Sequence, residues 1–527
     1  MSSKLAKSAG VIGLATMASR LLGVAREAVL AAVFGASASP AMDAFNVAFR
    51  VPNLLRDLFA EGAMTAAFVP TFTRTLTTQG KADAWRLGSM VMNALILVTS
   101  VLALLGIFFA PEITGAYAPA YAEVPGKLEL TTDLTRIMLP FLTLLAVAAA
   151  MMGMLNALRH FFVPSLSPAM FNVASIFSAL VLVPLMPYVG LPRIMGLAIG
   201  TLLGGLGQIL LQWPSLRREG FRYQPLVSFR DPAVLEILRL MGPATIGLAA
   251  VQVNLFVNTY LATWQEQGAV TWMQYAFRLM YLPIGLFGVS VATASLPDIS
   301  RQANANDLPS VRASVSRGLR MMLMLNVPAT VGLVVLAEAI VALIYERRMF
   351  NAYDTASTAQ ALMYYAPGLL GYSAVKIASP TFYALRDART PVTVSVLSVV
   401  ANIGMSLALV RVLGFRGLAL GTAIAAVLNA VVLLWLLRRR LGGLEGRRIA
   451  VSFAKISVAS LVMGLAAYVA LDWVTAMTPD GGELAKIMRV GVSIAAALLV
   501  LAASARLLRI QEFNDATAQV LARVGRR

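Results

Sequence analysis

The residues of this 527-residue chain that could do chemistry are arginines in otherwise apolar stretches. Five of them are surrounded by hydrophobic sequence: Arg20, Arg26, Arg50, Arg56 and Arg278. A charged side chain that faces lipid alone costs roughly 2.5–3.5 kcal/mol on insertion scales, so these residues must line water, a counter-ion or a ligand. The guanidinium group presents a planar fork of N–H donors that matches phosphate oxygens. The arginines therefore favour a ligand that carries phosphate.

Acidic residues in the same part of the chain offer a second interpretation. Four charged residues fall within about 40° of one another on a helix that turns 100° per residue: Asp43, Arg50, Asp57 and Glu61. For Asp57 and Glu61 two interpretations stay open. They form part of an ion-pair ladder that joins the first two helices, or they belong to a binding site. Arg56 points away from this stripe unless Pro52 kinks the helix.

The composition argues against several other kinds of chemistry. The chain has 43 Lys and Arg against 25 Asp and Glu, no Cys and a single His, His160. It has neither an HExxH motif nor a GK[ST] phosphate loop, so we expect no metal enzyme, no nucleotide hydrolysis and no cofactor. In a soluble protein a charge of +18 would suggest nucleic acid. In a membrane protein it fits the positive-inside bias, and we expect no nucleic-acid partner.

The elements that must position these arginines are membrane-spanning helices. Hydrophobic residues make up 59% of the chain and charged residues 13%, and the mean hydropathy is +0.77. An ordinary soluble domain is about 25% charged. Since each spanning helix needs roughly 20 residues, the chain has room for about fourteen. The sequence predicts an all-α polytopic membrane protein of about 14 transmembrane helices.

Basic residues are concentrated in alternate loops of this arrangement. One side holds the N-terminus, the Arg-rich segment over residues 438–448 and the C-terminal tail. The opposite loops carry acidic residues such as Glu112, Glu123 and Asp472. By the positive-inside rule both termini lie in the cytoplasm, and an even number of helices agrees with this.

An internal repeat divides the chain. Short segments recur in the same order at offsets of about 221–228 residues: Gly196–Thr201 as Gly417–Thr422, Ala157–Arg159 as Ala384–Arg386, and Phe49-Arg50 as Phe277-Arg278. Six spans separate equivalent positions, so the repeats insert in the same orientation, with a substrate site between them. We predict two parallel six-helix repeats, an N-lobe over 1–222 and a C-lobe over 223–440. Two extra C-terminal helices and a cytoplasmic tail follow over 441–527.

Several motifs resemble one known family. They are Ser19-Arg-Leu-Leu-Gly-Val-Ala-Arg26, Asp43-Ala-Phe, Pro52-Asn-Leu-Leu-Arg56, Phe59-Ala-Glu-Gly-Ala63, Ala67-Phe-Val-Pro70, Met241-Gly-Pro243 and Arg389-Thr-Pro391. Together they resemble the MurJ/MviN family, the lipid II flippases of the MOP exporter superfamily, and the similarity covers the whole chain.

The resemblance implies a central cationic cavity that opens alternately to each side of the membrane. Family residues reported as essential carry over to Arg20, Arg26, Asp43, Arg56 and Arg278. Five further residues are expected to support the cavity: Ser19, Glu27, Arg50, Asn53 and Glu61. The last two helices correspond to a groove for the polyprenyl tail. This chain has Phe277 where relatives often have Asp. Some relatives have a sodium site in the second lobe, and the sequence does not identify its ligands here.

The function implied is flipping of lipid II, the undecaprenyl-diphosphate-linked disaccharide peptide, across the bacterial cytoplasmic (inner) membrane for peptidoglycan synthesis. The expected partners are lipid II and membrane lipids, the expected state is a functional monomer, and coupling to membrane potential or a monovalent ion is expected. Three alternatives stay open: a flippase for another polyprenyl-diphosphate oligosaccharide, a cation-coupled drug antiporter of the same superfamily, and a non-transporting scaffold with this fold.

Overall fold

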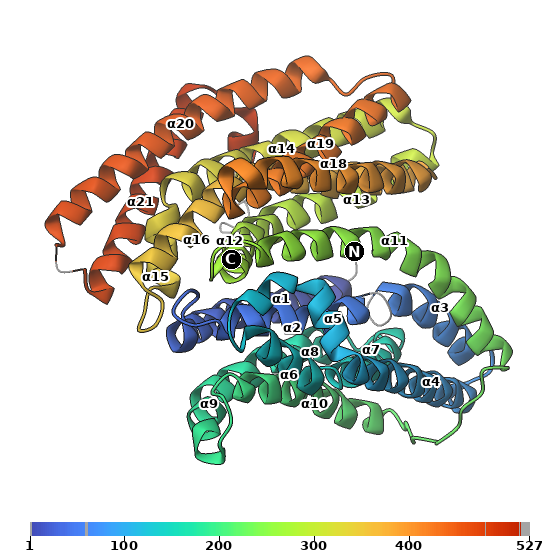
Figure 1. Cartoon of the computed structure of the whole chain (residues 1–527). Helices are drawn as coiled ribbons and strands as arrows, with labels where there is room; N and C mark the ends of the chain where they lie inside the picture. The colour runs from blue at the N-terminus through green and yellow to red at the C-terminus, as the bar shows by residue number, and fades with distance from the viewer. Residues whose placement is uncertain (1–2, 58–61, 480, 516, 518–527) are drawn as a thin grey trace. The chain divides into compact units, whose positions relative to one another are not determined.

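The computed structural model describes residues 3–57, 62–479, 481–515 and 517, with the backbone alone described at 3–16, 62–66 and 242–251. Glu61, one of the expected cavity residues, lies outside the described residues. The described chain is a succession of helices without strands, which confirms the predicted all-α fold (Figure 1).

Ten helical stretches in the described part of the chain are long and apolar enough to cross a membrane. They are Lys81–Phe108, Lys127–Ala157, Phe162–Val189, Met195–Arg218, Ala269–Asn304, Leu308–Val335, Arg389–Leu413, Phe415–Arg440, Gly446–Met477 and Glu483–Leu507. The chain is therefore a multi-pass membrane protein, and the number of fourteen spans stays a prediction.

The chain packs as two compact units, of which the first contains residues 1–271 and 347–350. Its helices are α1 (Ser3–Phe34), α2 (Ala41–Arg56), α3 (Gly62–Thr78), α4 (Lys81–Phe108), α5 (Ala110–Tyr117), α6 (Lys127–Met138), α7 (Phe141–Ala157), α8 (Phe162–Phe177), α9 (Val183–Leu185), α10 (Met195–Arg218) and α11 (Pro232–Thr263). A core of large side chains on α3, α4 and α7, including Phe68, Phe72, Trp85 and Met154, holds part of this unit together.

The second unit contains residues 272–346 and 351–527. Its helices are α12 (Ala269–Pro283), α13 (Val289–Asn304), α14 (Leu308–Val335), α15 (Ala337–Tyr345), α16 (Ala352–Tyr365), α17 (Gly368–Ala384), α18 (Arg389–Leu413), α19 (Phe415–Arg440), α20 (Gly446–Met477) and α21 (Glu483–Leu507). Gly417 allows α18 and α19 to approach closely, because a Cβ there would lie 2.4 Å from the carbonyl oxygen of Leu409.

The helix boundaries reproduce the internal repeat. Helices α4 and α14 begin 227 residues apart and end 227 residues apart, and α7 and α17 do the same. The predicted duplication is therefore present in the fold as well as in the motifs. Helix α11 packs in the first unit. The predicted repeat boundary at residue 222 instead assigns this helix to the C-lobe. The boundaries at residues 222 and 440 stay a prediction about the repeat.

The last two helices, α20 and α21, lie side by side (Figure 1). Small and medium-sized residues face inward along them, among them Ala459, Gly464, Ala467, Ala497 and Ala505. Such residues let helix backbones approach in lipid, where packing replaces the hydrophobic effect as the driving force.

Candidate functional site

Helix α2 carries two of the expected site residues at its opposite ends. Asp43 lies in its first turn and Arg56 is its last residue, so the two are about 20 Å apart at 1.5 Å per residue. Pro52 lies inside the helix between them. The surroundings of the two ends differ sharply in charge, burial and free space.

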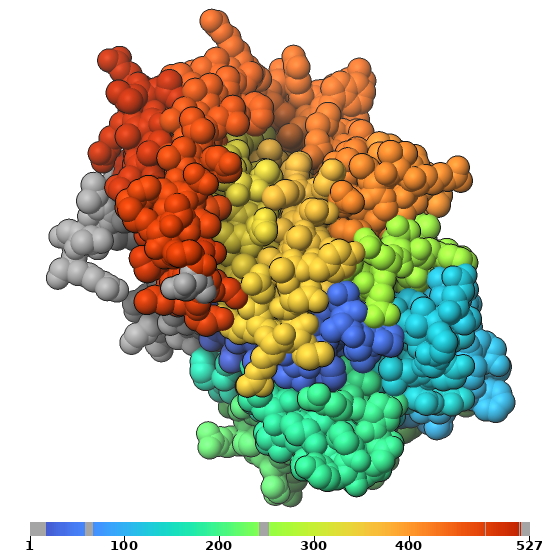
Figure 2. Space-filling model, turned by 60° about the vertical axis from the view of Figure 1, so that its left-hand side comes forward, coloured from blue at the N-terminus to red at the C-terminus, as the bar shows by residue number. Residues whose placement is uncertain are grey.

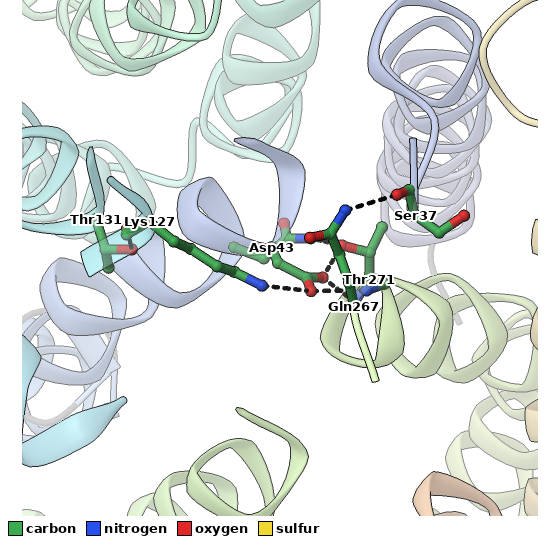
Figure 3. Close-up of polar contacts among 8 residues, drawn as sticks. Ser37, Asp43, Lys127, Thr131, Gln267 and Thr271 are labelled. Carbon is green, nitrogen blue, oxygen red and sulfur yellow. Dashed lines mark hydrogen bonds and ion pairs between the residues drawn. The ribbon is translucent and has the colours of Figure 1, made fainter. Parts of the chain in front are cut away.

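Asp43 is almost completely buried, with 2% of its surface exposed, and its carboxylate is saturated with donors (Figure 3). Oδ2 accepts from the backbone N–H of Gly268 at 2.8 Å and from the Lys127 ammonium at 3.3 Å. Oδ1 accepts from the backbone N–H of Thr271 at 3.1 Å and from its hydroxyl at 2.7 Å. The carboxylate thus binds the start of α12 and a buried cation at once.

The partners of Asp43 are themselves held in place. Lys127 is 3% exposed, and its ammonium lies 4.0 Å from the centre of the Tyr121 ring. Gln267, just before α12, donates to the carbonyl oxygen of Ser37 at 2.7 Å (Figure 3). Thr271 stands 228 residues after Asp43, which is the repeat offset found for Phe49-Arg50, so the acid bonds to its own repeat equivalent. This end of α2 is a closed polar node.

Arg26 is also buried and paired. It is 8% exposed, its Nη2 lies 3.0 Å from Oε1 of Glu27, and its guanidinium carbon lies 5.2 Å from the centre of the Phe171 ring. Glu27 is 1% exposed. A buried guanidinium needs such a partner, because an isolated ion in a low dielectric is costly.

Arg56 lies in a more open place. Its Nε and Nη2 donate to Oδ1 of Asp57 at 2.9 and 2.7 Å, and about a quarter of each side chain is exposed. Oδ2 of Asp57 accepts from Nε2 of Gln252 at 3.1 Å. Arg56 also lines a cavity of about 30 Å³ between α7, α8 and α10, together with Ser167, Gln208 and Gln212.

The other expected residues lie apart from these pairs. The carbonyl oxygen of Ser19 accepts from Nδ2 of Asn172 at 3.1 Å, and Arg20 and Arg50 are half-buried on α1 and α2. Asn53 is half-buried, and its Oδ1 has no hydrogen-bond partner among the described residues. Arg278 is exposed on α12 in the second unit. A diphosphate clamp formed jointly by Arg20, Arg26, Arg56 and Arg278 therefore stays a prediction.

Sequence reasoning missed three residues that the structure brings to these places. Lys127 had no assigned role, yet it is the buried partner of Asp43. Gln252 and Gln212 had no assigned role, yet Gln252 binds Asp57 and Gln212 lines the cavity beside Arg56. For Gln252 and Gln212 the sequence did contain a signal. Each is an amide side chain inside an apolar span, and in lipid such a group needs a hydrogen-bond partner.

The last two helices carry an apolar groove. Its volume is about 510 Å³, and its lining is almost wholly hydrocarbon. The lining residues are Val462, Leu465, Ala466, Val469, Ala470, Trp473 and Val500. Figure 2 shows the orange-red side chains of this part of the chain as one continuous surface. Within the described chain, no group of three or more His, Asp or Glu residues could hold a metal ion.

These features define a class of protein: a helical, multi-pass membrane transporter built on a duplicated bundle. One solved structure, described as lipid II flippase MurJ in an inward-closed conformation, matches it with a TM-score of 0.75 and 26% identity. The match covers 94% of this chain and 99% of that one. An inward-facing MATE multidrug transporter of the MOP superfamily matches with a TM-score of 0.66 over 81% of this chain and 96% of that one, but at 15% identity this shows the fold alone.

The chain belongs to the MurJ family, because the family model described as lipid II flippase MurJ matches residues 30–479. A probable lipid II flippase MurJ of Rhizobium meliloti is 35% identical, covering 89% of this chain and 87% of the relative. The corresponding protein of Vibrio cholerae is 33% identical, covering 82% and 83%. A lipid II flippase MurJ of Burkholderia cenocepacia is 34% identical, covering 81% and 82%. The expected family is confirmed.

Proposed function

We propose that this protein flips lipid II from the inner to the outer leaflet of the cytoplasmic membrane by alternating access, for peptidoglycan synthesis. The observation that carries the proposal is the match of the MurJ family model to residues 30–479, joined by a full-length structural match to a MurJ protein. No bond is made or broken in this process. The protein is a transporter, and both of its termini lie in the cytoplasm.

The head group and the tail of the substrate need different surroundings. The diphosphate is held by the guanidinium groups of Arg20, Arg26, Arg56 and Arg278, whose planar donors match phosphate oxygens. The polyprenyl tail lies in the apolar groove of α20 and α21, which supports this role through its hydrocarbon lining and its volume of about 510 Å³. The tail thus stays in an apolar environment while the head group crosses.

Return of the empty carrier is biased by the membrane potential. A cationic site that crosses the membrane changes in energy by roughly 2.3 kcal/mol per charge per 100 mV. Coupling to a monovalent ion is the alternative source of energy. A single chain contains both repeats and the groove, so the functional unit is a monomer.

The test is complementation of a strain depleted of its own flippase, with lipid II accessibility at the cell surface as the readout. Arg26→Ala and Arg278→Ala abolish growth and surface lipid II at normal expression, because each removes a phosphate donor. Arg301→Ala is the matched control, since this arginine on α13 is 78% exposed and pairs with Asp298. Full activity of both site variants would remove the arginine clamp from the mechanism, while failure of the wild-type chain to complement would reject the function itself.

A further inference from the structure

The small cavity beside Arg56 is lined in part by polar side chains that have no role in binding the diphosphate. Gln212 is completely buried on α10 and lines this cavity. Its Nε2 lies 3.2 Å from the carbonyl oxygen of Ala148, 3.0 Å from the hydroxyl oxygen of Ser167 and 3.1 Å from the carbonyl oxygen of Gln208. Three acceptors around one nitrogen fix the orientation of the amide, because the flipped amide would place its oxygen against two carbonyls.

The other end of this amide lacks a donor. Oε1 of Gln212 is buried and has no hydrogen-bond partner among the residues whose side chains the structure describes. A buried carbonyl without a donor loses its hydration without compensation, so native proteins rarely keep one without a ligand or a water. The missing partner is a hydrogen-bond donor, which means a hydroxyl or an N–H group.

The unpaired acceptor in this cavity disfavours an anion such as the diphosphate as its occupant. An anion would meet Oε1 of Gln212 without a proton between them, which is repulsive. The cavity volume of about 30 Å³ exceeds the roughly 10–15 Å³ that a single water molecule needs, so a small polar group has room there.

The remaining walls suit the tip of a neutral substituent. Leu145, Ala149, Met152 and Pro168 supply apolar surface, while Arg56 supplies donors at the rim. Because Arg56 is about a quarter exposed and also lines the cavity, a group that touches Arg56 reaches the cavity directly. A hydroxyl or carboxamide group can donate to Oε1 of Gln212 and accept from Arg56 at the same time.

We propose that Ser167, Gln208 and Gln212, with Arg56 at the rim, form a subsite that receives a neutral hydroxyl or carboxamide group of the sugar-peptide head group. The subsite adjoins the diphosphate site, and Arg56 belongs to both. The subsite rests on the proposed function and deepens it. It gives the carrier a means to distinguish a complete head group from a bare polyprenyl diphosphate, since only the former has such a group to place there.

The test measures binding of two lipids to the purified full-length protein: lipid II and undecaprenyl diphosphate, which lacks the sugar and peptide. Gln212→Leu removes Oε1 at similar volume. Its expected effect is about a tenfold loss of affinity for lipid II, the size of one neutral hydrogen bond, with the affinity for undecaprenyl diphosphate unchanged within about twofold. Gln302→Leu is the matched control, because Oε1 of Gln302 on α13 is likewise buried without a described partner and lies outside this cavity.

A second variant keeps the test decisive if Gln212→Leu does not fold. Ala149→Val fills the cavity without touching a polar group, and the same selective loss of lipid II affinity is expected. Equal weakening of both lipids by Ala149→Val, or no change with either lipid, would overturn the subsite; the latter result means that the cavity holds water alone. Failure of the unmodified protein to bind lipid II would instead reject the proposed function.

Discussion

The two ends of α2 both carry a charged pair, but the pair at one end is buried and the pair at the other is partly exposed. Asp43 and Lys127 are both almost fully buried, and the carboxylate accepts from four donors. Arg56 and Asp57 keep about a quarter of their side-chain surfaces exposed, and Arg56 borders a cavity in which Oε1 of Gln212 lacks a donor. Where every polar group has a partner, as around Asp43, the hydrogen bonds stabilise the fold. Where an acceptor lacks a donor, as in the cavity beside Arg56, a hydrogen bond remains available to a ligand.

This comparison changes the interpretation of Asp43. The family resemblance places it among the essential residues, which had suggested contact with substrate. In the structure its carboxylate accepts hydrogen bonds from Gly268, Thr271 and Lys127 and so holds the start of α12. Contact of Asp43 with substrate stays a prediction. Helix α12 also carries Arg278, seven residues beyond Thr271, or about two turns.

The largest expected effect is at the closed end. Asp43→Asn leaves the Lys127 ammonium buried without a counter-charge, which costs about 3–5 kcal/mol of unfolding free energy. Denaturant titration of the detergent-solubilised protein measures this loss. The double variant Asp43→Asn with Lys127→Met should recover most of the stability, because it removes both charges. Unchanged stability in Asp43→Asn alone would show that the node is not sealed from water.

A smaller effect on stability is expected at the open end. Arg56→Met should cost about 1 kcal/mol or less, because solvent screens a pair that is partly exposed. The same variant should nevertheless lose flippase activity in the complementation assay. If Arg56→Met destabilises the protein as much as Asp43→Asn does under identical conditions, the two ends of α2 do not differ in their contribution to stability.

The smallest effect is expected at an exposed cluster away from both ends of α2. Hydrogen bonds from His160 and Lys81, at 2.8 and 3.1 Å, hold the pKa of Glu219 below its ordinary value of 4.5. A lowered carboxyl pKa stabilises the folded state above about pH 4.5, and this stabilisation is lost as the pH falls through the folded-state pKa. Melting temperatures from pH 7 to pH 3 should therefore fall slightly less for Glu219→Gln than for the wild type. A steeper fall in the variant would contradict this sign.

Much of the fold was predictable because it depends on local sequence. Long apolar runs specify helices in lipid, where every backbone polar group must be satisfied within the segment. The repeat was visible in motifs such as Ala157–Arg159 and Ala384–Arg386, and helices α7 and α17 end at the first residue of each. The family was also predictable, since most of its motifs lie close together between residues 19 and 70.

The pairing of charges was not predictable, because it depends on which helices pack together. Asp43 and Lys127 are 84 residues apart, and Asp57 and Gln252 are 195 residues apart. Helical periodicity placed Asp43 and Asp57 on one stripe, but it gave no information about partners on other helices. Gln212 in particular gained a role only from the cavity that α7, α8 and α10 form around it.

By itself, the sequence determined that this chain spans a membrane repeatedly, that it is duplicated, and that it carries arginines where lipid would not tolerate them. Those properties follow from composition and from short-range periodicity. Only the tertiary structure decided which charges are sealed and which border free space. The physical reason is that burial and hydrogen-bond satisfaction are properties of packed neighbours, and those neighbours come from distant parts of the chain.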